Sequence, residues 1–179
     1  MTLPLRSALF ATIALALGGA SSGALAQGAP AAQPVELGKY NAWTAYSAPA
    51  KSGKVCYALS QPSARKPSGL NRDPAYLFIS NRPRENVRNE VSVIIGFPAK
   101  AGSAVDVTVP RAGQFALYAK DDGAFAQSVE EEAKLVRAMR GASGAMTLKS
   151  TSVRGNVTTD TYSLSGISAA LDRIDRECK

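Results

Sequence analysis

The sequence predicts a mainly β fold, an antiparallel β-sandwich that carries two short α-helices, one of them C-terminal. Between residues 40 and 127, short runs rich in Val, Ile, Tyr and Phe are separated by clusters of Gly, Pro, Asn and Asp, as in strands joined by turns. Two later stretches have the apolar period of 3.6 residues that is typical of an amphipathic helix. Because these helices do not alternate with the strands, a parallel α/β sheet is not expected.

Residues 1–26 have the pattern of a secretory signal peptide. Arg6 precedes the apolar tract 8–17, and Ala24-Leu25-Ala26 matches an A-x-A cleavage site. The apolar tract is too short to span a membrane. We therefore expect an exported protein, either periplasmic or outer-membrane-associated or extracellular, with no transmembrane segment after cleavage. Residues 27–38, rich in Ala, Pro and Gln, read as a flexible tether, and residues 39–179 as one folded domain.

Turn residues and apolar runs predict the order of the strands. The run 91–97 is apolar on both faces for part of its length and ends at Pro98, which predicts a central strand. Asp122-Gly123 accepts the positive φ angles of a tight turn, so the runs on either side should pair as an antiparallel hairpin. The predicted strands lie near residues 40–46, 54–60, 75–81, 90–97, 104–109, 114–119, 124–127, 145–153 and 157–164.

The first helix is predicted to begin at Ser128, because Ser128 and Glu131 have the spacing of a capping box. Glu130 and Lys134 are placed for an i,i+4 ion pair. Glu132 is a misfit, since it falls among the apolar positions. The arc expected to face the core holds Val129, Ala133, Leu135, Val136 and Met139.

The second helix is predicted from about Ser165 to the end of the chain. Ile167, Leu171, Ile174 and Cys178 share one face, so Cys178 should point toward the core.

The chain has two cysteines, Cys56 and Cys178. In an oxidising compartment such a pair most often forms a disulfide, and one intramolecular pairing exists. In the chain-entropy model, closing so long a loop stabilises the fold by roughly 4 to 5 kcal/mol. The alternative, a redox-active thiol, is less favoured because the chain has no C-x-x-C spacing and no His to lower a thiol pKa.

Composition restricts the possible chemistry. The chain has 21 Lys and Arg, 14 Asp and Glu, no His, and a net charge of +7. A basic exported domain is attracted to anionic surfaces such as lipopolysaccharide, lipid head groups or acidic polymers, although such a charge also suits ordinary solubility. The absence of His excludes the standard Ser-His-Asp and Cys-His mechanisms and His-ligated zinc or haem. We expect no catalytic residue, no metal and no cofactor.

The candidate binding segment is the connection 81–89, which carries Arg82, Arg84 and Arg88 between two predicted strands. Forked guanidinium donors suit phosphate or carboxylate groups, and loops on a rigid sandwich often carry binding. The alternative is a solvated loop. Nucleic acid is not an expected partner, because export removes the chain from it and no stacking motif accompanies the arginines.

Other motifs have structural explanations. Ser63 and Lys66 match S-x-x-K, but Pro67 follows at once and the companion motifs of that enzyme class are absent, so we expect a polar loop. The acids 130–132 suit the positive end of a helix dipole. Aromatic residues in strands could line a ligand groove but are more often core residues or cross-strand pairs; these are Trp43, Tyr46, Tyr57 and Tyr76.

Residues 40–178 resemble the invasion-associated locus B family of exported alphaproteobacterial proteins. The resemblance rests on NAWTAY around Trp43, KVCYALSQP around Cys56, DPAYLFISNRP, NEVSVIIGFP, FALYAKDDGAF and above all RGNVTTDTYSLSGISAALDRIDREC. It implies a small periplasmic or envelope-associated domain with an immunoglobulin-like β-sandwich, and it brings no catalytic residues. Many members have more cysteines, for instance where this chain has Ala45 and Tyr46.

We therefore expect a non-enzymatic exported envelope protein, an interaction or host-association module that binds an anionic envelope or host-surface component. The oligomeric state is left open. One alternative is a periplasmic structural or chaperone-like factor that receives a partner strand at a sheet edge. Another is a His-free hydrolase or glycan-acting enzyme.

Overall fold

The computed structural model describes residues 33–179, which form a mainly β, antiparallel, sandwich-like domain with two helices, as predicted. The predicted signal peptide and residues 27–32 of the tether lie outside the described residues. The strands are β1 (Val35–Tyr40), β2 (Trp43–Ala50), β3 (Gly53–Ser60), β4 (Ala64–Lys66), β5 (Tyr76–Arg82), β6 (Val87–Ile94), β7 (Ala104–Val109), β8 (Gly113–Lys120), β9 (Gly123–Phe125), β10 (Ala145–Thr151) and β11 (Val157–Ser163). The helices are the 3₁₀ turn η1 (Pro83–Glu85), α1 (Val129–Gly141) and α2 (Ile167–Glu177).

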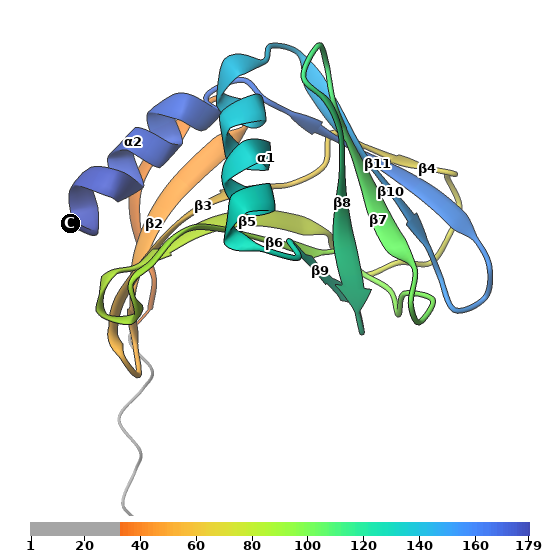
Figure 1. Cartoon of the computed structure of the whole chain (residues 1–179), viewed down its shortest axis with the longest axis horizontal. Helices are drawn as coiled ribbons and strands as arrows, with labels where there is room; N and C mark the ends of the chain where they lie inside the picture. The colour runs from red at the N-terminus through yellow and green to blue at the C-terminus, as the bar shows by residue number, and fades with distance from the viewer. Residues whose placement is uncertain (1–32) are drawn as a thin grey trace, which may run out of the picture. The chain divides into compact units, whose positions relative to one another are not determined.

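One antiparallel ladder of hydrogen bonds runs through the described strands in the order β1-β2-β3-β5-β6-β9-β8-β7-β10-β11-β4. The short strand β9 joins the strands β1, β2, β3, β5 and β6 to the strands β8, β7, β10, β11 and β4. It pairs with residues 92–94 of β6 and with residues 118–120 of β8. In Figure 1, β2, β3, β5 and β6 lie toward the left and β7, β10 and β11 toward the right. The edges of the sheet are therefore β1 and β4.

The helices cover the inner face of the sheet and close the core. Helix α2 packs against β1, β2 and β3, and α1 packs against β6. The predicted apolar faces are confirmed for most positions, with Leu135, Val136, Met139, Ile167, Leu171, Ile174 and Cys178 all buried. Ala133 is half-buried, and Val129 is 73% exposed because it is the first residue of α1 and precedes the part of the helix that meets the sheet.

The aromatic residues are divided between the two faces. Trp43 is fully buried in the core. Tyr46 of β2 stacks on Tyr57 of β3 with ring centroids 5.3 Å apart, and Tyr57 in turn contacts Phe78 of β5 at 5.9 Å. These are half-buried cross-strand pairs on the outer face, one of the two expected arrangements.

The start of the domain differs from the prediction. The predicted strand 40–46 is two strands, β1 and β2, joined at Asn41, which has a φ of 53°. β1 begins at Val35, within the predicted tether. Its Glu, Gly and Lys residues have low strand propensity, but pairing with β2 stabilises it as a strand.

Two other predicted boundaries differ. β6 ends at Ile94, because Gly96 has a φ of 78° and the backbone N–H of Ile95 donates to Asp122 instead. Part of the predicted polar loop 63–66 is the short strand β4, which pairs with β11 through Lys66 and Thr159. Residues 64–66 therefore form a strand because β11 pairs with them, and not because of their own composition.

The polar residues of α1 explain the misfit in its apolar arc. Ser128 caps the helix as predicted, its hydroxyl accepting from the N–H of Glu131 at 3.2 Å. Lys134 pairs with Glu131 at 2.8 Å, not with Glu130. Glu132 accepts a hydrogen bond from the N–H of Val91 at 2.6 Å. Since β9 pairs only with residues 92–94 of β6, this carboxylate supplies an acceptor where the neighbouring strand stops.

Candidate functional site

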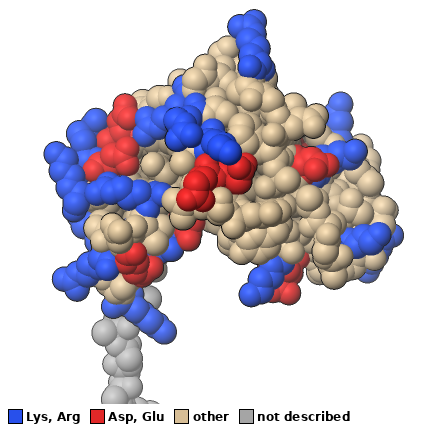
Figure 2. Space-filling model, in the orientation of Figure 1, with Lys and Arg blue, Asp and Glu red and all other residues tan. Residues whose placement is uncertain are grey.

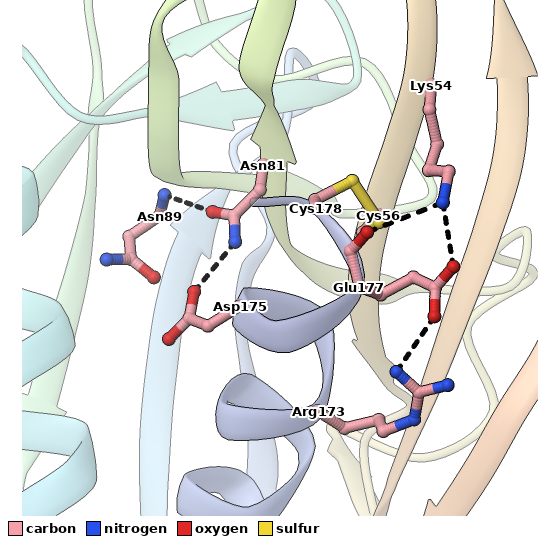
Figure 3. Close-up of a disulfide and its surroundings, with 8 residues drawn as sticks. All are labelled: Lys54, Cys56, Asn81, Asn89, Arg173, Asp175, Glu177 and Cys178. Atoms are coloured by element: carbon pink, nitrogen blue, oxygen red, sulfur yellow. Dashed lines mark hydrogen bonds and ion pairs between the residues drawn. A yellow bond between two sulfur atoms is a disulfide. The ribbon is translucent and has the colours of Figure 1, made fainter.

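The predicted disulfide is present and joins β3 to the end of α2. Cys56 and Cys178 are linked with their Cα atoms 6.0 Å apart, and both are buried. Figure 3 shows the bridge between the strand and the last turn of the helix. It ties residues 122 positions apart in the chain.

A buried amide beside the disulfide holds the same helix to the β5–β6 hairpin. Asn81 is fully buried, and its side-chain amide donates to Asp175 Oδ1 at 2.8 Å. Its side-chain carbonyl accepts from the backbone N–H of Asn89, also at 2.8 Å (Figure 3). The amide therefore connects β5, the start of β6 and α2.

A third contact lies on the solvent side of the disulfide. Lys54 Nζ lies 2.7 Å from Glu177 Oε1, and Arg173 lies 3.0 Å from Glu177 Oε2 (Figure 3). The hydrogen bonds from Lys54 and Arg173 lower the pKa of Glu177 below its ordinary value. Together these contacts fix the end of α2 against β3 and β5.

The β2–β3 turn and η1 meet at this end of the domain. The Ser52 hydroxyl donates to Glu85, and the Arg84 side chain lies across the backbone of Gly53. A shallow pocket of ≈ 430 Å³ lies between these segments and the end of the chain; it is lined by Gly53, Lys54, Pro83, Arg84, Glu177, Cys178 and Lys179.

Of the three predicted anion-binding arginines, Arg82 is used within the fold. It lies at the end of β5, 2.6 Å from Glu85 Oε2 and 2.8 Å from Glu90 Oε1, with a second contact to Glu90. The bond to Glu90 is the main cause that raises the pKa of Arg82, and hydrogen bonds from Ser52 and Arg82 lower that of Glu85. Both carboxylates are thus partners of Arg82, which leaves it less available to a ligand.

Arg84 and Arg88 are exposed, and among residues 33–179 neither has a carboxylate within ion-pair distance. The same is true of Lys51 on the β2–β3 turn and of Lys179. We call these four residues the basic tip. Figure 2 shows Lys and Arg gathered on the left of the domain, where Figure 1 places α2 and these hairpin ends.

The remaining sequence motifs have structural partners. The Ser63 hydroxyl donates to the carbonyl of Thr161 at 3.2 Å, and Lys66 stands opposite Thr159 in the sheet, so S-x-x-K serves strand pairing. Within residues 33–179, no three acidic or cysteine side chains come close enough together to hold a metal ion.

A polar cluster on the β4–β11 side of the domain was not predicted from the sequence. Asp160 is 6% exposed and receives hydrogen bonds from Arg65 at 3.1 Å and from Arg72 at 3.2 Å. Tyr162 is fully buried beside this cluster, and burial raises the pKa of its hydroxyl. The available signal was the alternation along β11, which places Asp160 on the same face as buried Thr158 and Tyr162, where an acid requires cationic partners.

The sequence of residues 43–175 matches the family model described as invasion associated locus B (IalB) protein. The chain belongs to the IalB family. The match spans both the disulfide-bearing strand β3 and most of α2, and it confirms the resemblance seen in the sequence. IalB membership supports an invasion-associated protein of the cell envelope.

The fold is similar to the crystal structure of invasion associated protein B from Bartonella henselae. The TM-score is 0.55 at 15% sequence identity, over 80% of this chain and 96% of that chain. At this identity the similarity establishes the IalB fold. Among curated proteins, none matches the sequence. No helix in residues 33–179 has the length and apolar character needed to cross a bilayer.

Proposed function

We propose that this IalB protein is a non-enzymatic, exported envelope protein that binds an anionic envelope or host-surface component through the basic tip. The observation that supports the proposal is the exposure of Arg84 in η1 and of Arg88 at the start of β6, without carboxylate partners among the described residues. Guanidinium groups offer paired donors that match phosphate and carboxylate oxygens.

The tip is held in place before any ligand arrives. The disulfide, the Asn81 amide and the Lys54–Glu177 pair all fix the segments that carry it. A site whose backbone is already ordered loses less conformational entropy on binding. The cations at the tip therefore suit a multivalent anionic surface, such as phosphorylated lipid head groups or an acidic polymer.

The proposal is tested by capturing partners from detergent-solubilised envelope with the oxidised protein at low and high salt. The test variant is Arg84→Glu/Arg88→Glu, which spares Arg82 and its two ion pairs. The matched control is Lys100→Glu/Arg137→Glu, which makes the same charge change at exposed cations on other elements.

We expect the wild type and the control to capture the same component, and the Arg84→Glu/Arg88→Glu variant to lose it, as high salt also should. Equal capture by all three proteins at both salt concentrations would refute the role of the tip. It would direct attention to the open edge of β1, the alternative binding mode.

A further inference from the structure

We propose a second binding site, separate from the basic tip, that takes a small acidic sugar: a hydroxyl-bearing ring with one carboxylate or phosphate group. The site is a pocket of ≈ 360 Å³ beside the β10–β11 turn. Figure 1 draws β10 and β11 toward the right of the domain. Three segments line it, residues 70–73, residues 96–98 and the β10–β11 turn. We call it the polar pocket.

The walls of the polar pocket are joined to one another by backbone hydrogen bonds. The N–H of Asp73 donates to Gly96 at 3.0 Å, which joins the first segment to the second. The N–H of Val153 donates to Pro98 at 3.0 Å, which joins the second to the third. Within the β10–β11 turn, Ser152 donates to the carbonyl of Asn156 at 2.9 Å. The pocket is therefore preformed, as small-molecule sites usually are.

The charges at the pocket favour an anion. Arg72 lines it with its side chain only 7% exposed, and Asp160 pairs with both Arg72 and Arg65. The two guanidinium groups share one buried carboxylate and donate their other N–H groups to the carbonyls of Pro67, Asp73 and Ile95, so the cluster keeps an excess of one positive charge. Arg154, on the turn, adds an exposed cation with no carboxylate within ion-pair distance among the described residues. Asp73 is the carboxylate that lines the pocket itself, so these three cations outnumber the two acids.

The other lining groups match a sugar ring. Asn71 and Asn156, both exposed, offer amide groups that can bond to hydroxyls. Phe97 and Pro98 provide an apolar surface for the C–H side of a ring. The volume lies at the lower end of the range for small-molecule pockets, so a monosaccharide is the size that fits.

The test is calorimetric titration of the oxidised protein at low salt with glucuronate, with glucose 6-phosphate and with neutral glucose. The variant is Arg154→Gln, on an exposed turn where folding should not be affected. Its control is Arg111→Gln, on the exposed β7–β8 turn. We expect saturable binding of at least one acidic sugar and none of glucose. Arg154→Gln should weaken that binding about tenfold, as the loss of one charge-assisted hydrogen bond does, while Arg111→Gln should not.

The two acidic probes distinguish the sources of the anionic group, since preference for glucuronate or for glucose 6-phosphate identifies a carboxylate or a phosphate. Absence of saturable binding to both, equal binding of glucose, or unchanged binding by Arg154→Gln would overturn the proposal. The Arg84→Glu/Arg88→Glu variant should bind the sugar as the wild type does. The sugar titration and the envelope capture therefore test the two proposed sites independently.

Discussion

Asn81 of β5 donates a hydrogen bond to Asp175 of α2 at 2.8 Å, although the two residues are 94 positions apart in the chain. The same side chain accepts from the N–H of Asn89, so this fully buried amide is bonded on both sides. It sets the position of the last helix relative to the hairpin that carries Arg84 and Arg88. Asn81 therefore couples the basic tip to the core, together with the disulfide and the Lys54–Glu177 pair.

Replacing Asn81 by Leu should lower the free energy of unfolding by about 1 to 3 kcal/mol, because the N–H of Asn89 is left buried without its acceptor. Urea denaturation followed by circular dichroism measures the change. The control Asn71→Leu alters an exposed loop residue and should stay within about 0.5 kcal/mol of the wild type. An Asn81→Leu protein as stable as the wild type would contradict the role given to this amide.

Removing the disulfide should cost more. In the chain-entropy model, Cys56→Ala/Cys178→Ala lowers the free energy of unfolding by roughly 4 to 5 kcal/mol, since the bridge spans 122 residues. The loss is measured by denaturation of this variant relative to the oxidised wild type. The wild type under reducing conditions should show the same loss. A loss below about 1 kcal/mol would show that the remaining contacts of α2 suffice to hold it.

The stability contribution of Glu132 should depend on pH. Burial raises the pKa of this carboxyl above its ordinary value of 4.5, so the folded state binds the proton more tightly than the unfolded state does. Stability from this group is therefore greatest below pH 4.5 and falls as pH rises through the folded pKa. Gln keeps an acceptor for the N–H of Val91 without titrating. Glu132→Gln should therefore gain stability relative to the wild type across this interval.

Denaturation of both proteins from acid to neutral pH gives that difference. Glu132→Ala is the companion variant, and it should be less stable than Glu132→Gln by about 1 kcal/mol because Val91 loses its acceptor. If the difference between wild type and Glu132→Gln did not change with pH, the raised pKa would be refuted.

Gly96 should be more sensitive to substitution than Gly155. Both have left-handed φ angles, 78° and 80°, so an added side chain meets similar backbone strain. A Cβ at Gly96 would lie 2.2 Å from the carbonyl oxygen of Asp73, whereas at Gly155 it would meet nothing within 4 Å. We expect Gly96→Ala to destabilise the protein by about 2 kcal/mol more than Gly155→Ala, as overpacking does. Thermal denaturation of the pair checks this, and equal effects would mean that the 70–73 loop moves away freely.

Several features of the domain were readable in the sequence because they depend on neighbouring residues. Ser128 caps α1 through an N–H only three residues away. The hairpin of β8 and β9 forms as predicted, but the left-handed residue of its turn is Asp121 (φ 54°), whereas Gly123 is the first residue of β9. Cys178 followed from the helical period, and its pairing followed from there being no other cysteine.

Other features depend on residues that the chain brings together from a distance. The strand at Val35 exists because β2 offers it a partner, and β4 exists because β11 does. Glu132 does not fit the apolar pattern of the helix. The fold explains it, because the N–H of Val91 lies beside it and needs an acceptor. In the sequence Arg82 is equivalent to Arg84 and Arg88 as a candidate anion ligand. In the fold it forms ion pairs with Glu85 and Glu90.

The sequence by itself determined the fold class, the helix positions, the disulfide and the family, because periodicity, capping and composition are local properties of the chain. Only the tertiary structure decided which charges are available. An arginine seen in sequence carries no information on its partner, and Arg72 meets Asp160 across 88 residues of chain. Packing brings such charges into contact, and contact determines whether an arginine holds the fold together or faces a ligand.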